Sequence, residues 1–185
     1  MVKFVKTSTK FIRTDQENSI KIRAFTESDI SILFTRFAEI NWLKPLSTFE
    51  TYLQEQKFGE RIVWIASYNN EFAGYVTLKW CSKYKPFQDQ GIPEIMDLNV
   101  LPLMRNRNIG STLLEVAEKE AVKKSDIVGL GVGLYADYGA AQKLYVKRGY
   151  IPDGLGVTYK YKDIKPGAEV DLDDDLVLWF IKKLK

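Results

Sequence analysis

The 185-residue sequence contains no histidine and a single cysteine, Cys81. The absence of histidine excludes a Ser-His-Asp or Cys-His triad and any zinc or iron site with histidine ligands. One cysteine forms no intrachain disulfide and no multi-cysteine metal site. Without a histidine to activate it, Cys81 is interpreted as a partly buried structural thiol rather than a nucleophile.

The sequence also lacks an apolar run of the roughly 18–20 residues that a membrane-spanning helix needs, so no membrane is expected as a partner. Residues 1–10 alternate apolar and basic side chains, which is not the pattern of a secretory signal. The net charge of +3 is too small to indicate nucleic acid as a partner without a recognition motif. The cytoplasm is the expected location.

Acidic residues gather in one stretch, at Glu169, Asp171, Asp173, Asp174 and Asp175. They lack the glycine and glutamate spacing of a calcium-binding loop. The stretch is therefore interpreted as a solvated loop, and no metal site is expected anywhere in the chain.

With 45% hydrophobic and 28% charged residues, the chain has the composition of a globular protein. Its length fits one domain with a sizeable core. Residues 1–18 are basic early and acidic later, and they are expected to form an N-terminal extension, either poorly ordered or an extra edge strand. Residues 19–185 are expected to form the domain.

Hydrophobic periodicity predicts strands and helices in mixed order. Strands are expected over residues 20–25, 61–68, 72–80, 94–101, 127–132 and 176–181, with Tyr150-Ile151 re-entering the sheet. Helices are expected over 30–41, 47–57, about 109–124 and 137–148, and a polar loop over 83–93. This order predicts a single α/β domain with a central mixed, mostly antiparallel sheet flanked by about four helices.

A basic loop, Arg105-Asn-Arg-Asn-Ile-Gly110, follows Pro102 and precedes a helix. It places unpaired backbone N–H groups, the positive end of a helix dipole and two arginines at one point, which suits a phosphate or pyrophosphate. It is not a Walker loop or a dinucleotide fingerprint, because the required lysine and two of three glycines are missing. A solvated basic turn is the alternative interpretation.

This stretch resembles the coenzyme A signature of the GNAT superfamily of N-acetyltransferases, Gln/Arg-x-x-Gly-x-Gly/Ala at a strand-to-helix junction. Arg105 matches the first position and Gly110 the last. Asn108 stands where the middle glycine is usual, and asparagine is the non-glycine residue that best tolerates positive φ. The approach over residues 97–102 also resembles the strand that leads into this loop.

A second stretch resembles another hallmark of the family, Ala-x-x-Leu-Tyr-x-x-x-Gly-Phe/Tyr. Its residues here are Ala141, Leu144, Tyr145, Gly149 and Tyr150. The family's usual asparagine one turn earlier is replaced by Tyr138 or its neighbour Asp137, so one coenzyme contact is unassigned. The two motifs occur in the expected order, and the resemblance spans residues 19–181. It implies a GNAT-like domain over residues 19–185.

The resemblance implies that an acetyl group moves from acetyl-CoA, the cosubstrate, to an amine that attacks the thioester directly. A backbone N–H of residues 98–100 would hold the oxyanion, and residues 105–111 would hold the pyrophosphate. The implied coenzyme contacts are Leu98, Asn99, Val100, Arg105, Asn106, Arg107, Asn108, Ile109, Gly110, Ser111, Ala141 and Tyr145. A non-catalytic acyl-CoA-binding sensor or interaction module on the same fold is the alternative function.

The reaction needs a proton acceptor, because a primary amine with a pKa near ~10 is mostly protonated at neutral pH. With no histidine, this acceptor is a carboxylate (Glu94 or Asp97), a tyrosine or water. Glu94 is preferred because it lies eleven positions before Arg105, which resembles the spacing of the base in some family members. Ideal alternation places Glu94 and Asp97 on opposite faces, unless a bulge, usual in this strand of the family, breaks that parity. Tyr145 matches the family position whose phenol protonates the leaving thiolate.

The acceptor pocket is expected from two loops, by analogy with the family. Trp42 lies in the loop between the first two helices, and Trp80, Tyr84 and Phe87 lie in or beside the loop after the hairpin. Acceptor specificity resides in variable loops, so the fold does not identify the substrate. A small-molecule amine and a peptide amine both remain open, as does a homodimer formed through the C-terminal strand.

Overall fold

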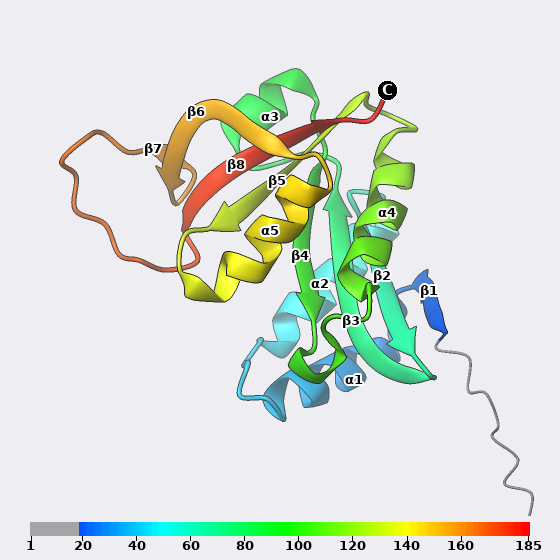
Figure 1. The fold of residues 1–185 in the computed structure, drawn as a ribbon. Helices are drawn as coiled ribbons and strands as arrows, with labels where there is room; N and C mark the ends of the chain where they lie inside the picture. Colours follow the sequence, from blue (N-terminus) through cyan, green and yellow to red (C-terminus); the bar gives the residue numbers. More distant parts are fainter. Residues whose placement is uncertain (1–18) are drawn as a thin grey trace, which may run out of the picture.

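The computed structural model describes residues 19–185, which form an eight-stranded sheet in the order β1-β2-β3-β4-β5-β8-β6-β7 (Figure 1). All neighbouring strands are antiparallel except β4 and β5. The predicted mixed, mostly antiparallel sheet is therefore confirmed, whereas the predicted extension 1–18 lies outside the described residues. The strands are β1 (Ile20–Ala24), β2 (Arg61–Tyr68), β3 (Glu71–Lys79), β4 (Glu94–Val100), β5 (Ile127–Gly133), β6 (Ile151–Tyr159), β7 (Lys162–Asp163) and β8 (Leu176–Lys183).

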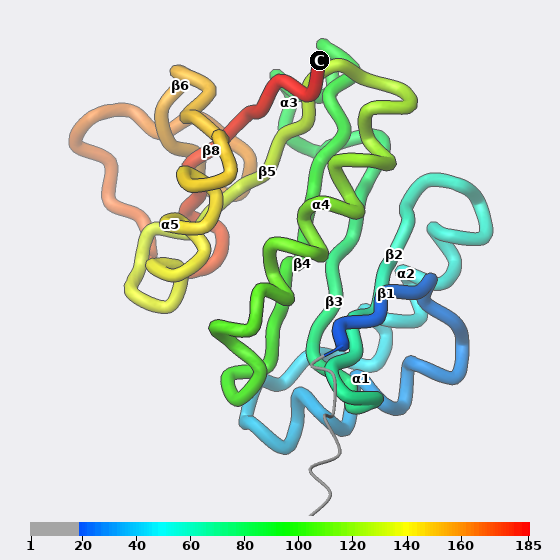
Figure 2. The backbone as a smooth tube through the Cα atoms, turned by 45° about the vertical axis from the view of Figure 1, so that its right-hand side comes forward, coloured from blue at the N-terminus to red at the C-terminus, as the bar shows by residue number. Residues whose placement is uncertain are grey.

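Helices cover both faces of the sheet (Figures 1 and 2). The α-helices are α1 (Asp29–Ala38), α2 (Leu46–Lys57), α3 (Lys85–Gln90), α4 (Ile109–Ala121) and α5 (Gly139–Lys147), with short 3₁₀ helices η1 (Pro102–Met104) and η2 (Ala136–Tyr138). The four predicted helices are confirmed within a few residues. Among residues 19–185, none of the helices has the length and hydropathy to cross a bilayer.

Helix α3 corrects the sequence prediction, which assigned residues 83–93 to a loop. Its six residues include a single buried apolar side chain, Phe87, and Gly91 ends it in the left-handed conformation at φ 63°. One apolar residue in a short polar stretch gives no helical period to detect. The helix forms because Phe87 packs on Gly129, where an added Cβ would lie 2.1 Å from the Phe87 ring.

The core lies in separate layers on the two faces of the sheet. One layer joins α4 and α5 to the sheet through residues such as Leu113, Val76 and Leu130, and the other joins α1 and α2 to it through Phe37 and Phe49. Strand β3 is buried along almost its whole length because both layers cover it. The helices on opposite faces therefore fix β3 and its neighbour β4, which carries candidate site residues.

The sheet opens between its two parallel strands. The register of β4 and β5 joins only Glu94 with Gly129 and Ile95 with Leu130. Beyond these pairs the two strands point in diverging directions (Figure 1). Helix α4 connects them and begins next to the opening, so the basic loop at its N-terminus faces the gap.

Candidate active site

The opening between β4 and β5 forms a cleft with a volume of about 1030 Å³. It is lined by residues from β4, the basic loop, α5 and the segment before β8. Most residues singled out in the sequence meet there: Trp42, Glu94, Asp97, Leu98, Asn99, Val100, Arg105, Asn106, Asn108, Ile109, Gly110, Ser111, Ala141 and Tyr145. Two motifs far apart in the sequence therefore share one cavity.

The basic loop contains two residues in the left-handed backbone conformation. Asn106 and Asn108 both adopt positive φ, at 60° and 64°, and Asn108 is the N-cap of α4. An asparagine at the usual glycine position is thus accommodated in the left-handed conformation. Gly110 lets α4 approach α5, since an added Cβ would lie 3.2 Å from the Leu144 side chain. The N-terminal N–H groups of α4, a thirteen-residue helix, are available to an anion at the cleft.

The two arginines of the loop differ in placement. Arg105 is exposed and lines the cleft, with its Nε 3.5 Å from the Val100 carbonyl oxygen. Arg107 instead places its guanidinium 4.7 Å from the centre of the Tyr68 ring, on β2. Arg107 is not among the described residues that line the cleft.

Glu94 is the most deeply buried carboxylate of the cleft. It begins β4 and is 3% exposed, and the Ser82 hydroxyl donates a 2.5 Å hydrogen bond to its Oε2. The pKa of Glu94 is raised to about 7, and burial is the largest cause. The Asp97 charge also raises this pKa, whereas the Ser82 hydrogen bond and the charges of Arg61 and Lys79 lower it. A carboxyl group with this pKa exists in both forms near neutral pH.

Asp97 lies in a bulge of β4. Its φ is 53°, and the register with β3 shifts between Tyr75 and Thr77. The expected bulge is confirmed, and it explains why Glu94 and Asp97 line one cleft despite their odd spacing. Tyr52 donates a 2.6 Å hydrogen bond to Asp97 Oδ2.

Tyr145 projects from α5 into the cleft. Its side chain is 7% exposed, and burial, followed by the Asp97 charge, raises its pKa. Gly149, at φ 87°, ends the helix region and lets Tyr150 turn back toward the core, where the two tyrosine rings lie 5.9 Å apart. Because its pKa is raised, Tyr145 remains a protonated phenol throughout the neutral pH range.

The predicted pocket aromatics separate into two groups. Trp42 lines the cleft and is 39% exposed. Tyr84 lies outside it, stacked on Trp179 at 4.1 Å, because its hydroxyl bonds Asp153 and its ring fills the core under α3. Trp80 also lies outside, packed against the α4 layer with the Lys124 ammonium 4.0 Å above its ring.

Cys81 is exposed rather than partly buried, which corrects the sequence interpretation. It immediately follows Trp80, and the side chains of the segment alternate as the chain leaves β3, so Ser82 rather than Cys81 faces the interior. The Gln88 amide nitrogen lies 3.7 Å from the Cys81 sulfur. The thiol is not among the described residues that line the cleft.

Several cleft residues have no motif in the sequence. Tyr135, Tyr161, Asp174 and Asp175 line the cleft, and Tyr135 and Tyr138 both donate to Asp174 Oδ1. The acidic stretch predicted as a solvated loop thus contributes a wall of the cleft. Within residues 19–185, no group of three or more histidine, cysteine, aspartate or glutamate side chains is arranged to hold a metal ion.

The cleft joins a basic loop at the N-terminus of α4 to a buried carboxylate and a buried phenol, an arrangement that fits an enzyme that transfers an acyl group from a coenzyme thioester. Residues 30–150 match the family model described as the Acetyltransferase (GNAT) family. This match covers more than half of the chain, and the chain therefore belongs to the GNAT acetyltransferase family and is an acyltransferase. No curated protein sequence is significantly similar to the chain.

Solved structures share the fold at low sequence identity. Ribosomal-protein-alanine N-acetyltransferase from Brucella melitensis is 21% identical, with a TM-score of 0.64 over 88% of this chain and 99% of that one. Arabidopsis thaliana NAA60 in complex with acetyl-CoA is 18% identical, with a TM-score of 0.65 over 89% and 98%. Spermidine N-acetyltransferase from Vibrio cholerae, in complex with CoA and spermine, is 13% identical, with a TM-score of 0.63 over 89% and 95%.

Proposed function

We propose that this protein transfers an acetyl group from acetyl-CoA to an amine by direct attack on the thioester. The observation that carries the proposal is the meeting of Glu94 and Tyr145 in the cleft at whose edge α4 begins. One group is a carboxyl with a pKa near 7, and the other is a buried phenol. A direct transfer needs one group to accept a proton and another to donate a hydrogen bond.

The coenzyme is proposed to bind along the opening of the sheet. Its pyrophosphate would accept hydrogen bonds from the N-terminal N–H groups of α4 and an ionic contact from Arg105. Its thioester would then extend between β4 and β5 toward Glu94. A protein that shares the fold, Arabidopsis thaliana NAA60, was solved in complex with acetyl-CoA, which supports acetyl-CoA as the coenzyme.

The reaction steps follow from these positions. Glu94 accepts a proton from the ammonium of the acceptor, and the neutral amine attacks the thioester carbonyl carbon. The resulting oxyanion is held by a backbone N–H of residues 98–100 in the bulged part of β4. The carbon–sulfur bond then breaks, and the thiolate leaves with a hydrogen bond from the Tyr145 hydroxyl. The attacking nitrogen gives up its second proton to the thiolate, and Glu94 releases its proton to solvent, so that a neutral amide and coenzyme A with a free thiol are the products.

Glu94 is favoured over Asp97 as the base because their surroundings differ. The only hydrogen bond to the Glu94 carboxylate among the described residues comes from Ser82. Asp97 already accepts a hydrogen bond from Tyr52, and its oxygens lie 3.8 Å from Arg61 and 3.9 Å from Lys44. Asp97 is therefore already engaged by a hydrogen-bond donor and two nearby cations, whereas Glu94 is desolvated by its burial.

The acceptor is proposed to be a small-molecule or peptide amine that enters from the side of Trp42. The cleft is lined by the carboxylates Glu94, Asp97 and Asp175 and by Tyr161, which suits a cationic group. Structurally similar proteins are named for a ribosomal-protein alanine and for spermidine as acceptors.

Two measurements test the proposed function. Calorimetry is expected to detect binding of acetyl-CoA, and thiol release with a panel of small amines, polyamines and peptides is expected to detect turnover. Binding without turnover for any amine would favour the non-catalytic acyl-CoA-binding module. Absence of binding at millimolar acetyl-CoA would overturn both functions.

Replacement of Arg105 by alanine is expected to weaken acetyl-CoA binding about tenfold, because one charge-assisted contact to an anion is lost. Calorimetry measures the affinity, and the melting temperature of the free protein should not change, since Arg105 is exposed. Arg107→Ala is the matched control, because its guanidinium lies on Tyr68 outside the cleft. Equal losses in the two variants would contradict a pyrophosphate site formed by the cleft side of this loop.

A further inference from the structure

A hydrogen bond between α2 and the bulge of β4 lies next to the proposed reaction centre. The Tyr52 hydroxyl donates to Asp97 Oδ2 at 2.6 Å, and the Tyr52 side chain is buried. Burial, followed by the Asp97 charge and this hydrogen bond, raises the pKa of Tyr52, so the phenol stays protonated and continues to donate. Tyr52 belongs to the core layer of α1 and α2, so this bond anchors Asp97 to a fixed part of the core.

The bulge is shaped from the side of β3 as well. Tyr75 pairs with Asn99 and Thr77 with Met96, so one β3 residue faces two on β4. At Gly74 an added Cβ would lie 2.3 Å from the Asn99 carbonyl oxygen, so only glycine allows β4 to lie this close. An aspartate at φ 53° is unfavourable by itself and persists only where its surroundings fix it.

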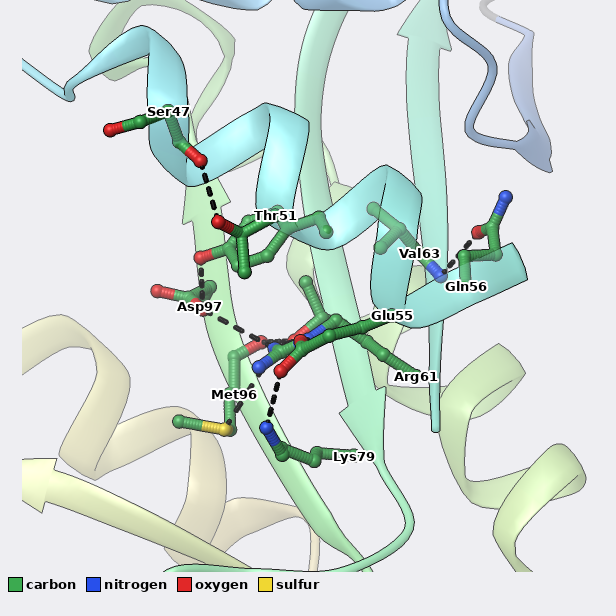
Figure 3. Close-up of polar contacts among 11 residues, drawn as sticks. Ser47, Thr51, Glu55, Gln56, Arg61, Val63, Lys79, Met96 and Asp97 are labelled. Carbon is green, nitrogen blue, oxygen red and sulfur yellow. Dashed lines mark hydrogen bonds and ion pairs between the residues drawn. The ribbon is translucent and has the colours of Figure 1, made fainter. Parts of the chain in front are cut away.

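A buried ionic network holds this anchor, the hydrogen bond between Tyr52 and Asp97, in place. Arg61 is 5% exposed, donates to Glu55 Oε2 at 2.5 Å and to Thr77 Oγ1 at 2.6 Å, and lies 4.6 Å from the Tyr52 ring centre. Lys79 donates to the other oxygen of Glu55 at 2.5 Å. Figure 3 shows Asp97, Arg61, Glu55 and Lys79 between α2 and the sheet.

We propose that Asp97 is a positioning residue, not the base, and that its bond to Tyr52 fixes the bulge so that a backbone N–H of residues 98–100 meets the oxyanion. The inference rests on the proposed acetyl transfer. Preorganised donors stabilise an oxyanion only when they are held close to their productive geometry. The anchor supplies that restraint from a helix that belongs to the core rather than to the cleft.

The charge of Asp97 also acts on Glu94. The groups that affect Glu94 are Ser82 from the loop after β3, Asp97 on its own strand, and Arg61 and Lys79 from β2 and β3. The Glu94 charge in turn raises the pKa of Tyr161. The Asp97 anion raises the pKa of Glu94, whereas Arg61 and Lys79 lower it. Removal of the Asp97 charge should therefore let Glu94 act as a base at lower pH.

Two tyrosine variants test the anchor. Tyr52→Phe is expected to lower kcat about tenfold and to leave the KM for acetyl-CoA within about twofold, because a misplaced donor weakens the transition state more than ground-state binding. Tyr84→Phe is the matched control: it removes a 2.8 Å tyrosine–aspartate bond outside the cleft and should leave kcat unchanged. If both variants keep the kcat of the wild type, or lose it equally, the anchor has no specific part in the reaction.

Asp97→Asn separates position from charge, because the amide oxygen still accepts the Tyr52 bond. This variant is expected to retain kcat within a few-fold, with the rising limb of kcat/KM against pH displaced to lower pH. A loss as large as that of Glu94→Gln would instead make Asp97 the base. Absence of turnover in the wild-type protein with every amine would overturn the proposed function, whereas wild-type turnover that survives Tyr52→Phe unchanged would overturn this inference alone.

Discussion

Replacement of Glu94 by glutamine is expected to lower kcat/KM for acetyl transfer about 10²–10⁴-fold, the usual contribution of a positioned general base. The substitution keeps the shape of the side chain and its bond to Ser82 but removes the proton acceptor. The KM for acetyl-CoA should change little, because Glu94 is not in the proposed coenzyme loop. Thiol release at saturating acetyl-CoA, with the acceptor varied, measures the loss.

The pH profile gives a second signature of Glu94. Because burial raises its pKa to about 7, the carboxyl is protonated and inactive at pH 5 and ionised at pH 8. In the wild-type protein kcat/KM should therefore rise through about pH 7, and Glu94→Gln should lose this step. A step that persists in the variant would assign the titration to another group.

Glu94→Gln, which is expected to lower activity, should raise the stability of the folded protein relative to the wild type as the pH increases from 4 to 8. The pKa of Glu94 is raised in the folded protein from 4.5 to about 7, so its contribution to stability is present below about pH 4.5 and lost as pH rises through 7. At pH 8 Glu94→Gln should thus be stabilised relative to the wild type by about 3 kcal/mol more than at pH 4. Urea unfolding at both pH values measures this difference.

Glu118 provides the control for a buried glutamate. It is 8% exposed and pairs with Arg148 and Lys182 outside the cleft. Glu118→Gln is expected to lower stability, because two partly buried cations lose their counter-charge, and to leave the pH profile of turnover unchanged. Similar losses of activity in the two variants would point to general damage of the fold rather than to the chemistry of Glu94.

The second large effect is expected for Tyr145→Phe, which should lower kcat about 10- to 100-fold. Burial raises the pKa of this phenol. The phenol is therefore a weaker acid than the thiol of coenzyme A, since an ordinary thiol has a pKa of about 8.5. Complete proton transfer to the thiolate is then unfavourable, so Tyr145 acts mainly by donating a hydrogen bond to the developing charge. Acetyl-CoA affinity, measured by calorimetry, should change little.

Tyr150→Phe is the matched control for Tyr145. Its ring lies 5.9 Å away in the same core layer, and burial followed by the Glu118 charge raises the pKa of its phenol. Tyr150 is not among the described residues that line the cleft. Its substitution should alter stability without altering kcat, and equal kinetic effects would remove Tyr145 from the proposed mechanism.

Local patterns were enough to predict most of the fold. Helices α1, α2 and α4 follow hydrophobic periods that their burial preserves, and β2 and β3 are apolar runs that are buried along most of their length. Helix α3 was not predicted from the sequence because its stability comes from the packing of Phe87 on Gly129, a contact between residues 42 positions apart. Periodicity detects an element with its own apolar stripe and misses one that depends on a distant partner.

The candidate site was predictable where a motif encodes backbone geometry. The motif at the junction of β4 and α4 accounts for the left-handed conformation of Asn108 and for the close approach of Gly110 to α5. Tyr52 was missed because its partner Asp97 lies 45 residues away and only the bulge turns that carboxylate toward it. Tyr84 was misplaced because proximity to a loop in the sequence does not show whether an aromatic ring faces the cleft or the core.

The opening between β4 and β5 also divides the sheet into two sets of strands, each contiguous in sequence, which share one core layer. Residues 20–100 build β1 to β4, and residues 127–183 build β5 to β8, with two paired positions between the two sets. Such a boundary favours sub-global opening, in which one half of the sheet exchanges its amide hydrogens without unfolding of the other. A ligand that spans the boundary would suppress this opening, and native-state hydrogen exchange in β5 and β8 would then report occupancy of the cleft from strands on one side of it.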